Sequence, residues 1–74
     1  MVGDRTGTVV EVRPFAIHGV PHVDVTIAWR DGGTATTRLG AESVPDGIEP
    51  GDEVLARLVM SSVVALERAD ADPA

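Results

Sequence analysis

The segment from His22 to Arg30 alternates apolar and polar side chains without interruption, and this pattern constrains the fold more than any other feature of the chain. Successive side chains of a β-strand point to opposite faces, so a period of two residues predicts a strand buried on one side. The Asp31-Gly-Gly sequence that follows supplies the positive φ angles of a tight hairpin turn. The expected core face of this strand consists of Val23, Val25, Ile27 and Trp29, with Trp29 as a core anchor.

Further runs of β-branched and apolar residues, separated by Gly, Pro and Asp, predict additional strands. Pro14 is expected to end the first run, and the third run is expected to pair with the second. In the fourth run the alternation places Val54, Ala56, Leu58 and Met60 on one face. The expected strands are Thr6–Arg13, His22–Arg30, Thr34–Leu39, Glu53–Met60 and Val63–Glu67.

The segment from Gly40 to Gly51 contains two prolines and three glycines, which rule out a long helix. A single helical turn fits near Ala41–Val44, and Pro50-Gly-Asp is typical of a type II turn. Five strands with so short a connection predict an all-β fold, a small closed barrel of the OB-like type, although an SH3-like barrel also fits. We expect one barrel domain over residues 1–68 and a disordered acidic tail over residues 69–74.

The composition excludes several classes of function. The chain has no cysteine, so neither a disulfide nor a thiolate metal site is possible. No apolar run reaches the roughly 20 residues that span a bilayer, and the start lacks a signal peptide, so a cytoplasmic protein without membrane contact is expected. Twelve acidic residues, six arginines and no lysine give a net charge of −6, which argues against nucleic-acid binding.

Several motifs occur in a fixed order along about 60 residues. The first strand contains Gly-x-Val-Val at Gly7–Val10, and the hairpin contains Gly-Gly at residues 32–33. The later motifs are Glu-Ser-x within Ala41–Val44, Gly-x-x-Pro-Gly-Asp-Glu-Val at Gly47–Val54, and a final stretch at Ala56–Leu66 that includes Met-Ser-Ser-Val. In this order and spacing the chain resembles the Mop family of molybdate-binding domains and the related TOBE domains.

The resemblance implies an oxyanion site between subunits. In that family backbone amides and hydroxyls near the Ser-Ser step hold the anion, together with a lysine just before it and an arginine near the N-terminus. Carried over to this chain, the resemblance implies Arg5, Met60, Ser61 and Ser62 as anion-binding residues. The family's lysine position is occupied by Val59, and the arginine position falls at Val2, three residues before Arg5.

Other polar residues have simpler interpretations. His18 and His22 are expected in a loop with a structural or solvent role, with Asp24 as the nearest additional ligand if a metal bound. Ser61 and Ser62 also fit a turn that joins two strands, and this interpretation is favoured on residue type alone. Asp52 and Glu53 are adjacent on a strand and so point apart, with Asp52 closing its turn. Arg38 and Arg57, like Arg5, are expected to be exposed strand residues with solvated heads.

No motif supplies the parts of an enzyme active site, so a non-enzymatic protein is expected. The resemblance implies a self-associating barrel, a homo-oligomer that binds or stores a small oxyanion such as molybdate or tungstate, with no other cofactor. The alternative is a ligand-free barrel that acts as an accessory or interaction subunit for a larger partner protein, and the acidic charge suits a basic partner.

Overall fold

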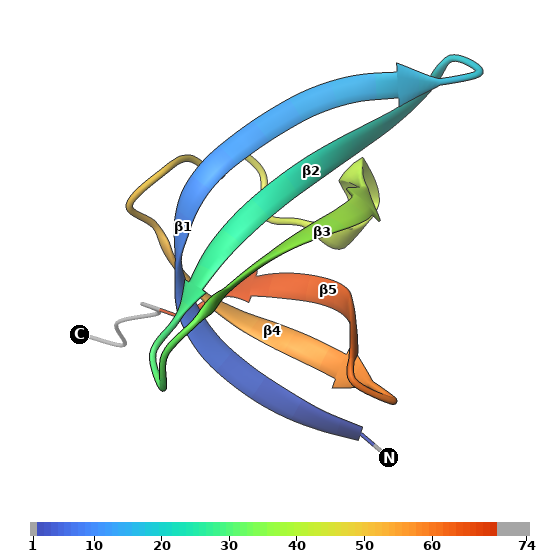
Figure 1. Ribbon diagram of the computed structural model, residues 1–74. Helices are drawn as coiled ribbons and strands as arrows, with labels where there is room; N and C mark the ends of the chain where they lie inside the picture. The colour runs from blue at the N-terminus through green and yellow to red at the C-terminus, as the bar shows by residue number, and fades with distance from the viewer. Residues whose placement is uncertain (1, 70–74) are drawn as a thin grey trace.

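In the computed structural model, residues 2–69 form a single antiparallel β-sheet of five strands with almost no helix (Figure 1). The strand order is β3-β2-β1-β4-β5, so the two halves of the sheet meet at β1. The all-β prediction is therefore confirmed for these residues. Of the disordered tail expected over residues 69–74, only Ala69 is described, and residues 70–74 lie outside the described part. The elements are β1 (Val2–Ile17), β2 (Val20–Trp29), β3 (Thr34–Gly40), the short 3-10 helix η1 (Ala41–Ser43), β4 (Glu53–Val59) and β5 (Ser62–Arg68).

Strand β1 is longer than the sequence pattern predicts, because it pairs with two partners in succession. Its first part, from Val2 to Thr8, pairs with β4, and its second part, from Gly7 to Ile17, pairs with β2. The expectation that Pro14 ends this strand is wrong. Beyond Thr8 the strand has no β4 partner on its second edge, and a proline is tolerated on a free strand edge. The second part of β1 and the start of β2 thus form a long two-stranded arm (Figure 1).

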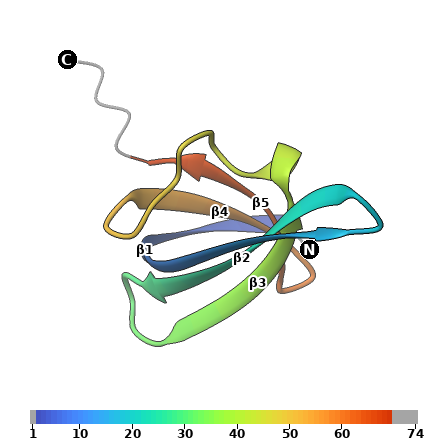
Figure 2. The same ribbon diagram turned by 90° about the horizontal axis from the view of Figure 1, so that it is seen from above.

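The sheet coils around a common interior, as Figure 1 and Figure 2 show from two directions. Within residues 2–69, however, β3 and β5 are the two ends of the sheet and do not pair with each other. The expected closed barrel is therefore not formed by strand pairing. Helix η1 and the segment after it connect β3 to β4, and η1 contacts β2, β3 and β5. Among the described residues no helix is long and apolar enough to cross a membrane.

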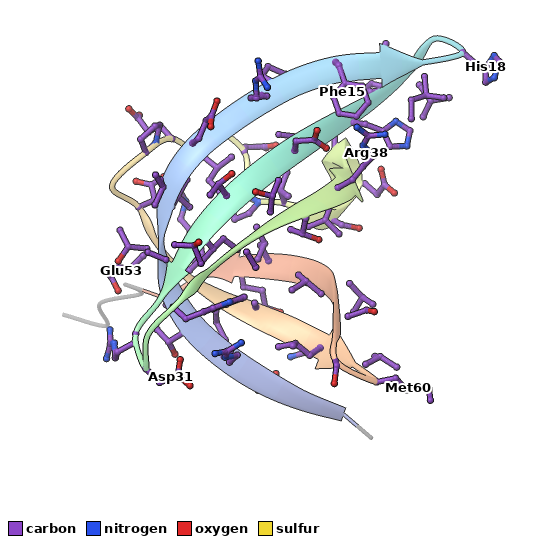
Figure 3. The ribbon with its side chains drawn as sticks, viewed as in Figure 1. Phe15, His18, Asp31, Arg38, Glu53 and Met60 are labelled. Atoms are coloured by element: carbon purple, nitrogen blue, oxygen red, sulfur yellow. The ribbon has the colours of Figure 1, made fainter. Side chains whose placement is uncertain are left out.

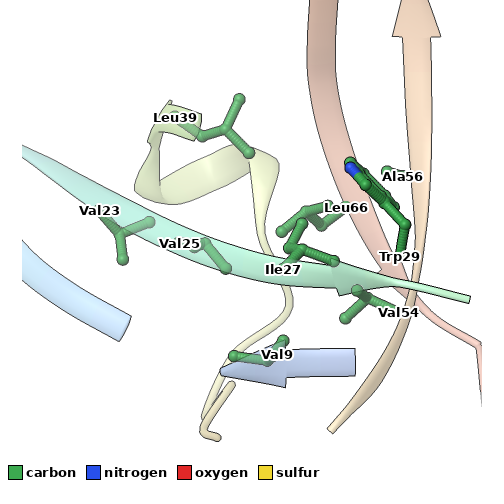
Figure 4. Packing of buried hydrophobic residues seen from close by; sticks show 9 residues of the cluster. All are labelled: Val9, Val23, Val25, Ile27, Trp29, Leu39, Val54, Ala56 and Leu66. Carbon is green, nitrogen blue, oxygen red and sulfur yellow. The ribbon is translucent and has the colours of Figure 1, made fainter. Parts of the chain in front are cut away.

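The core lies on the inner face of the curved sheet and is built from all five strands (Figure 4). The predicted face of β2 is buried along its whole length, and Trp29 is in the core as expected. On β4 the prediction holds for Val54 and Ala56 but is wrong for Met60, which is 77% exposed. The strand ends at Val59, so the alternation no longer applies to Met60. The buried residues are Val9, Val23, Val25, Ile27, Trp29, Leu39, Val54, Ala56 and Leu66.

Two β-bulges shift the alternation where the sequence shows no break. One lies between Val9 and Glu11 in β1, so Val9 and Val12 both pack on the core although they are three residues apart. The other lies between Arg57 and Leu58 of β4, which pair with Ala65 and Val63, so β5 has one extra residue, Val64. A bulge places two residues of one strand against one of its partner and increases the local bend and twist. The bulges therefore help to curve the sheet around its core.

Candidate functional site

The residues implied by the resemblance to the Mop family are centred on the turn between β4 and β5 (Figure 3). Met60 and Ser61 form a two-residue connection, and Val59 pairs with Ser62 across it. Both turn residues have left-handed φ angles, 52° for Met60 and 72° for Ser61. This is the geometry of a type I′ hairpin turn, which favours Asn and Gly. The turn interpretation of Ser61 is confirmed, whereas Ser62 is the first residue of β5.

The described structure does not bring Arg5 to this turn. Arg5 lies opposite Ala56 in the pairing of β1 with β4, three positions along the strand from the pair Val2–Val59. Its guanidinium donates a 2.9 Å hydrogen bond to the carboxylate of Asp31 and lies 4.5 Å from the centre of the Trp29 ring. Asp31 and Met60 lie at opposite sides of the view in Figure 3. Arg5 is thus held at the β2–β3 end of the molecule.

The two positions that carry cations in the resembling family are neighbours here. Val2 and Val59 are Cα partners in the pairing of β1 with β4. The nearest arginine along β4 is Arg57, which lies 3.8 Å from a carboxylate oxygen of Asp4 and 3.7 Å from one of Glu67. The surface next to the turn is apolar instead, because Val59, Met60 and Val64 are all exposed there. We call these three residues the apolar tip.

The remaining arginines are also engaged. Within residues 2–69, all six arginines lie 2.9–3.8 Å from a carboxylate oxygen. Three carboxylates of the same part of the chain, by contrast, have no arginine partner. They are Glu42, Asp46 and Glu49, and all three are exposed in the segment between β3 and β4. The uncompensated negative charge of the described structure is therefore concentrated in one loop, which we call the acidic loop (Ala41–Asp52).

The acidic loop is fixed to the sheet at its end. Asp52 accepts a 3.0 Å hydrogen bond from the backbone N–H of Glu49 and another of 3.0 Å from Arg68. Arg68 also donates to the backbone oxygen of Asp46 at 2.7 Å. The Glu49 N–H and then Arg68 lower the pKa of Asp52, because both stabilise its charged form. Asp52 closes its turn as predicted, and Gly51 has the positive φ of 98° that a type II turn requires.

A second polar cluster, not singled out from the sequence, lies on the outer face of β1, β2 and β3. Arg38 binds both carboxylate oxygens of Asp24, at 2.9 and 3.2 Å, and these hydrogen bonds lower the pKa of Asp24 and raise that of Arg38. The Arg38 guanidinium also lies 4.5 Å from the centre of the Phe15 ring. Phe15 in turn stacks on His22 with ring centres 5.8 Å apart. Pairing the alternating strands across the Gly-Gly hairpin would have predicted the contact of Asp24 with Arg38.

The histidines are separated by the structure. His18 lies in the turn at the end of the arm, with a left-handed φ of 50°. His22 is part of β2, as the expected strand from His22 to Arg30 predicted, and does not lie in a loop with His18. The Nδ1 atom of His22 lies 2.9 Å from the backbone oxygen of Val20. Among residues 2–69, no group of three or more His, Asp or Glu side chains is arranged to hold a metal ion.

Glu53 and Asp52 do not converge, as their adjacent positions predicted. Glu53 points to the outer face, where it accepts hydrogen bonds from Thr8 at 2.8 Å and from Arg30 at 3.1 Å. Asp52 is bound by Arg68 instead. The two carboxylates consequently have different partners and do not form an acid–base pair.

The geometry defines the chain as a small, curved antiparallel sheet with an apolar tip and an acidic loop. No protein-family model, curated protein or solved structure matches it.

Proposed function

We propose that this chain is an interaction subunit that binds a larger partner protein through exposed surfaces of its sheet. The observation that carries the proposal is the apolar tip: Met60 is 77% exposed, in a left-handed conformation that a methionine side chain disfavours. Backbone conformations of this kind cost of order 1–3 kcal/mol each and tend to occur where they serve function. Exposed apolar residues beside such a turn are typical of a contact surface.

The free strand edges support the same proposal. Strands β3 and β5 each pair on one side only within the described sheet. An unpaired strand edge presents N–H and C=O groups to which another chain can add a strand. Since β5 begins directly after the turn and contains Val64, its free edge and the apolar tip are contiguous.

The experiment purifies the Met60→Asn and Ser61→Gly variants from the native host under non-denaturing conditions and compares the partner protein that co-purifies with each. Asn at a left-handed position relieves backbone strain, so Met60→Asn is expected to keep or raise the melting temperature while losing a co-purifying partner. Ser61→Gly also relaxes the turn but retains Met60, so it should keep the partner. Retention of the partner by Met60→Asn, or a homo-oligomer with bound molybdate and no second protein, would contradict the proposal.

Oxyanion binding by a self-associating chain is the second candidate, and the exposed serines at the β4–β5 turn favour it. Their hydroxyls and the turn amides are donors suited to an oxyanion. Under this proposal the sheet belongs to the OB-like barrels of the Mop and TOBE type, with η1 placed between β3 and β5. A native mass spectrum of the untagged protein with added molybdate tests it. Mass gains in whole molybdate units that disappear in a Ser61→Ala, Ser62→Ala variant would support it, and an unchanged spectrum would exclude it.

A further inference from the structure

A hollow of about 320 Å³ separates the base of the β1–β2 arm from the acidic loop. Its walls are mainly apolar, and they come from both sides of the gap. The residues that matter here are Val12, Phe15, Pro21, Val44, Pro45 and Ile48. Val12, Val44 and Ile48 also pack against the core, so their positions are fixed by the fold. The volume lies at the lower end of the range of about 300–1,000 Å³ found for ligand pockets. The hollow therefore suits side chains or a short peptide segment.

The loop on one side of this hollow carries most of the uncompensated negative charge of residues 2–69. Asp46 lines the hollow, Glu49 directly follows the lining residue Ile48, and Glu42 lies between the lining residues Ala41 and Val44. All three carboxylates are exposed and have no arginine partner within residues 2–69. The arginines near Phe15 do not offset this charge, because Arg38 is bound by Asp24 and Arg13 lies 3.4 Å from Glu11.

From this arrangement we propose that the hollow docks a partner segment in which apolar side chains are flanked by lysine or arginine. The apolar residues would enter the hollow, and the basic residues would meet the carboxylates of Glu42, Asp46 and Glu49. Complementary charge at an interface speeds association and excludes partners of the wrong sign. A second copy of this chain does not fit the description, because it carries a net charge of −6 and each of its six arginines already lies beside a carboxylate. A nucleic acid or an anionic membrane surface is repelled for the same reason.

This inference rests on the proposed function, since it states the chemistry of the partner that an interaction subunit would bind. It concerns a different surface from the apolar tip, however, so an experiment can contradict the inference about the hollow without contradicting the proposal about the apolar tip, and the reverse. The Met60→Asn comparison tests the tip, and the titration below tests the hollow without any partner purified from cells.

The test is an NMR titration of the full-length, ¹⁵N-labelled protein with an acetylated hexapeptide of two leucines between two pairs of lysines. The largest amide shifts are expected at Val12, Val44 and Ile48. The same peptide with glycines in place of the leucines should lose these shifts. A peptide with glutamates in place of the lysines should not bind.

Two variants that remove the same number of charges show which carboxylates contribute to binding of the peptide. The triple variant Glu42→Gln, Asp46→Asn, Glu49→Gln should bind the lysine–leucine peptide about tenfold more weakly, since it loses three exposed ion pairs that each contribute modestly. The control triple variant Asp4→Asn, Asp31→Asn, Glu67→Gln removes the same charge elsewhere and should change the affinity less than twofold. Equal losses in both variants, shifts centred on the apolar tip, or no saturable binding would overturn the inference.

Discussion

Gly7 lies in β1 at a point where β2 leaves no room for a side chain. A Cβ atom at this site would lie 2.5 Å from Cγ2 of Ile27 and 2.7 Å from the backbone oxygen of Ala28. Ile27 is fully buried and the carbonyl belongs to the sheet, so neither can move aside cheaply. The glycine is thus required by the close approach of two strands and not by a special backbone angle.

We predict that Gly7→Ala lowers the free energy of unfolding by about 1–3 kcal/mol, the usual cost of overpacking. The matched control is Gly3→Ala in the same strand, where an added Cβ would meet no atom within 4 Å. Urea unfolding followed by Trp29 fluorescence measures both variants. Equal stability of the two would show that β1 and β2 are not packed as described.

Met60 shows that a period of two residues predicts the end of a strand poorly. The alternation along β4 extends to Met60 in the sequence, but the strand ends one residue earlier and the chain reverses. The Met-Ser pair lacks the Asn or Gly that usually marks a type I′ turn. The Ser61-Ser62 pair, which overlaps this turn, therefore predicted its position only to within a residue or two.

At the scale of single elements, the acidic loop depends on one carboxylate. Asp52 has a lowered pKa in the folded protein, so unfolding takes up a proton as the pH falls below the ordinary aspartate value of 3.8. Its stabilising effect is present above that value and is lost as the pH decreases through the folded pKa. Asp24, whose pKa Arg38 lowers, acts in the same direction.

We expect Asp52→Asn to be less stable than the natural protein at pH 7 and to lose less stability between pH 7 and pH 3. The two stability curves should then converge at low pH, as measured by urea unfolding at several pH values. Glu49→Gln is the control, because the backbone N–H that binds Asp52 is unchanged by it. The stability of Glu49→Gln should change with pH in parallel with that of the natural protein. If the stability of Asp52→Asn also changed in parallel, the Asp52 carboxylate would not stabilise the acidic loop.

The strands could be predicted where local pattern and tertiary contact agree, and not elsewhere. The face of β2, the Gly-Gly hairpin and the Pro-Gly turn follow from residue chemistry alone. The bulge after Val9 and the passage of β1 through Pro14 depend on which strands lie alongside, and one sequence carries no signal for that. The same holds for the candidate site: the turn at Ser61 was predictable, whereas the diversion of Arg5 to Asp31 and Trp29 was not.

For the whole molecule, a single core joins the two halves of the sheet. Val9 of β1, Ile27 of β2 and Val54 of β4 are all buried in one cluster. Within residues 2–69 the buried residues form one cluster shared by both halves, so the halves should not unfold independently. Small domains of this kind usually unfold in one cooperative step.

We predict that thermal unfolding gives the same midpoint by two probes. Trp29 is the only tryptophan, and its fluorescence reports on the core at the end of β2, whereas far-UV circular dichroism reports on all five strands. Coincident transitions are expected in the natural protein. An Ile27→Ala variant should shift both midpoints downward together, with a loss of about 2–5 kcal/mol. Separate transitions would show that the β2–β3 and β4–β5 halves are autonomous.

The double pairing of β1 also sets the order in which the chain can fold while it is being synthesised. The β1–β2 arm is complete as soon as residue 29 has been made, but the first part of β1 must wait for β4, since Thr8 bonds to Glu53 across 45 residues. At roughly 5–20 residues per second, that wait is about 2–9 s. During this interval the first part of β1 has a free strand edge in the nascent chain. Ribosome-bound chains that stop before β4 should therefore be more prone to pair with one another than the finished protein.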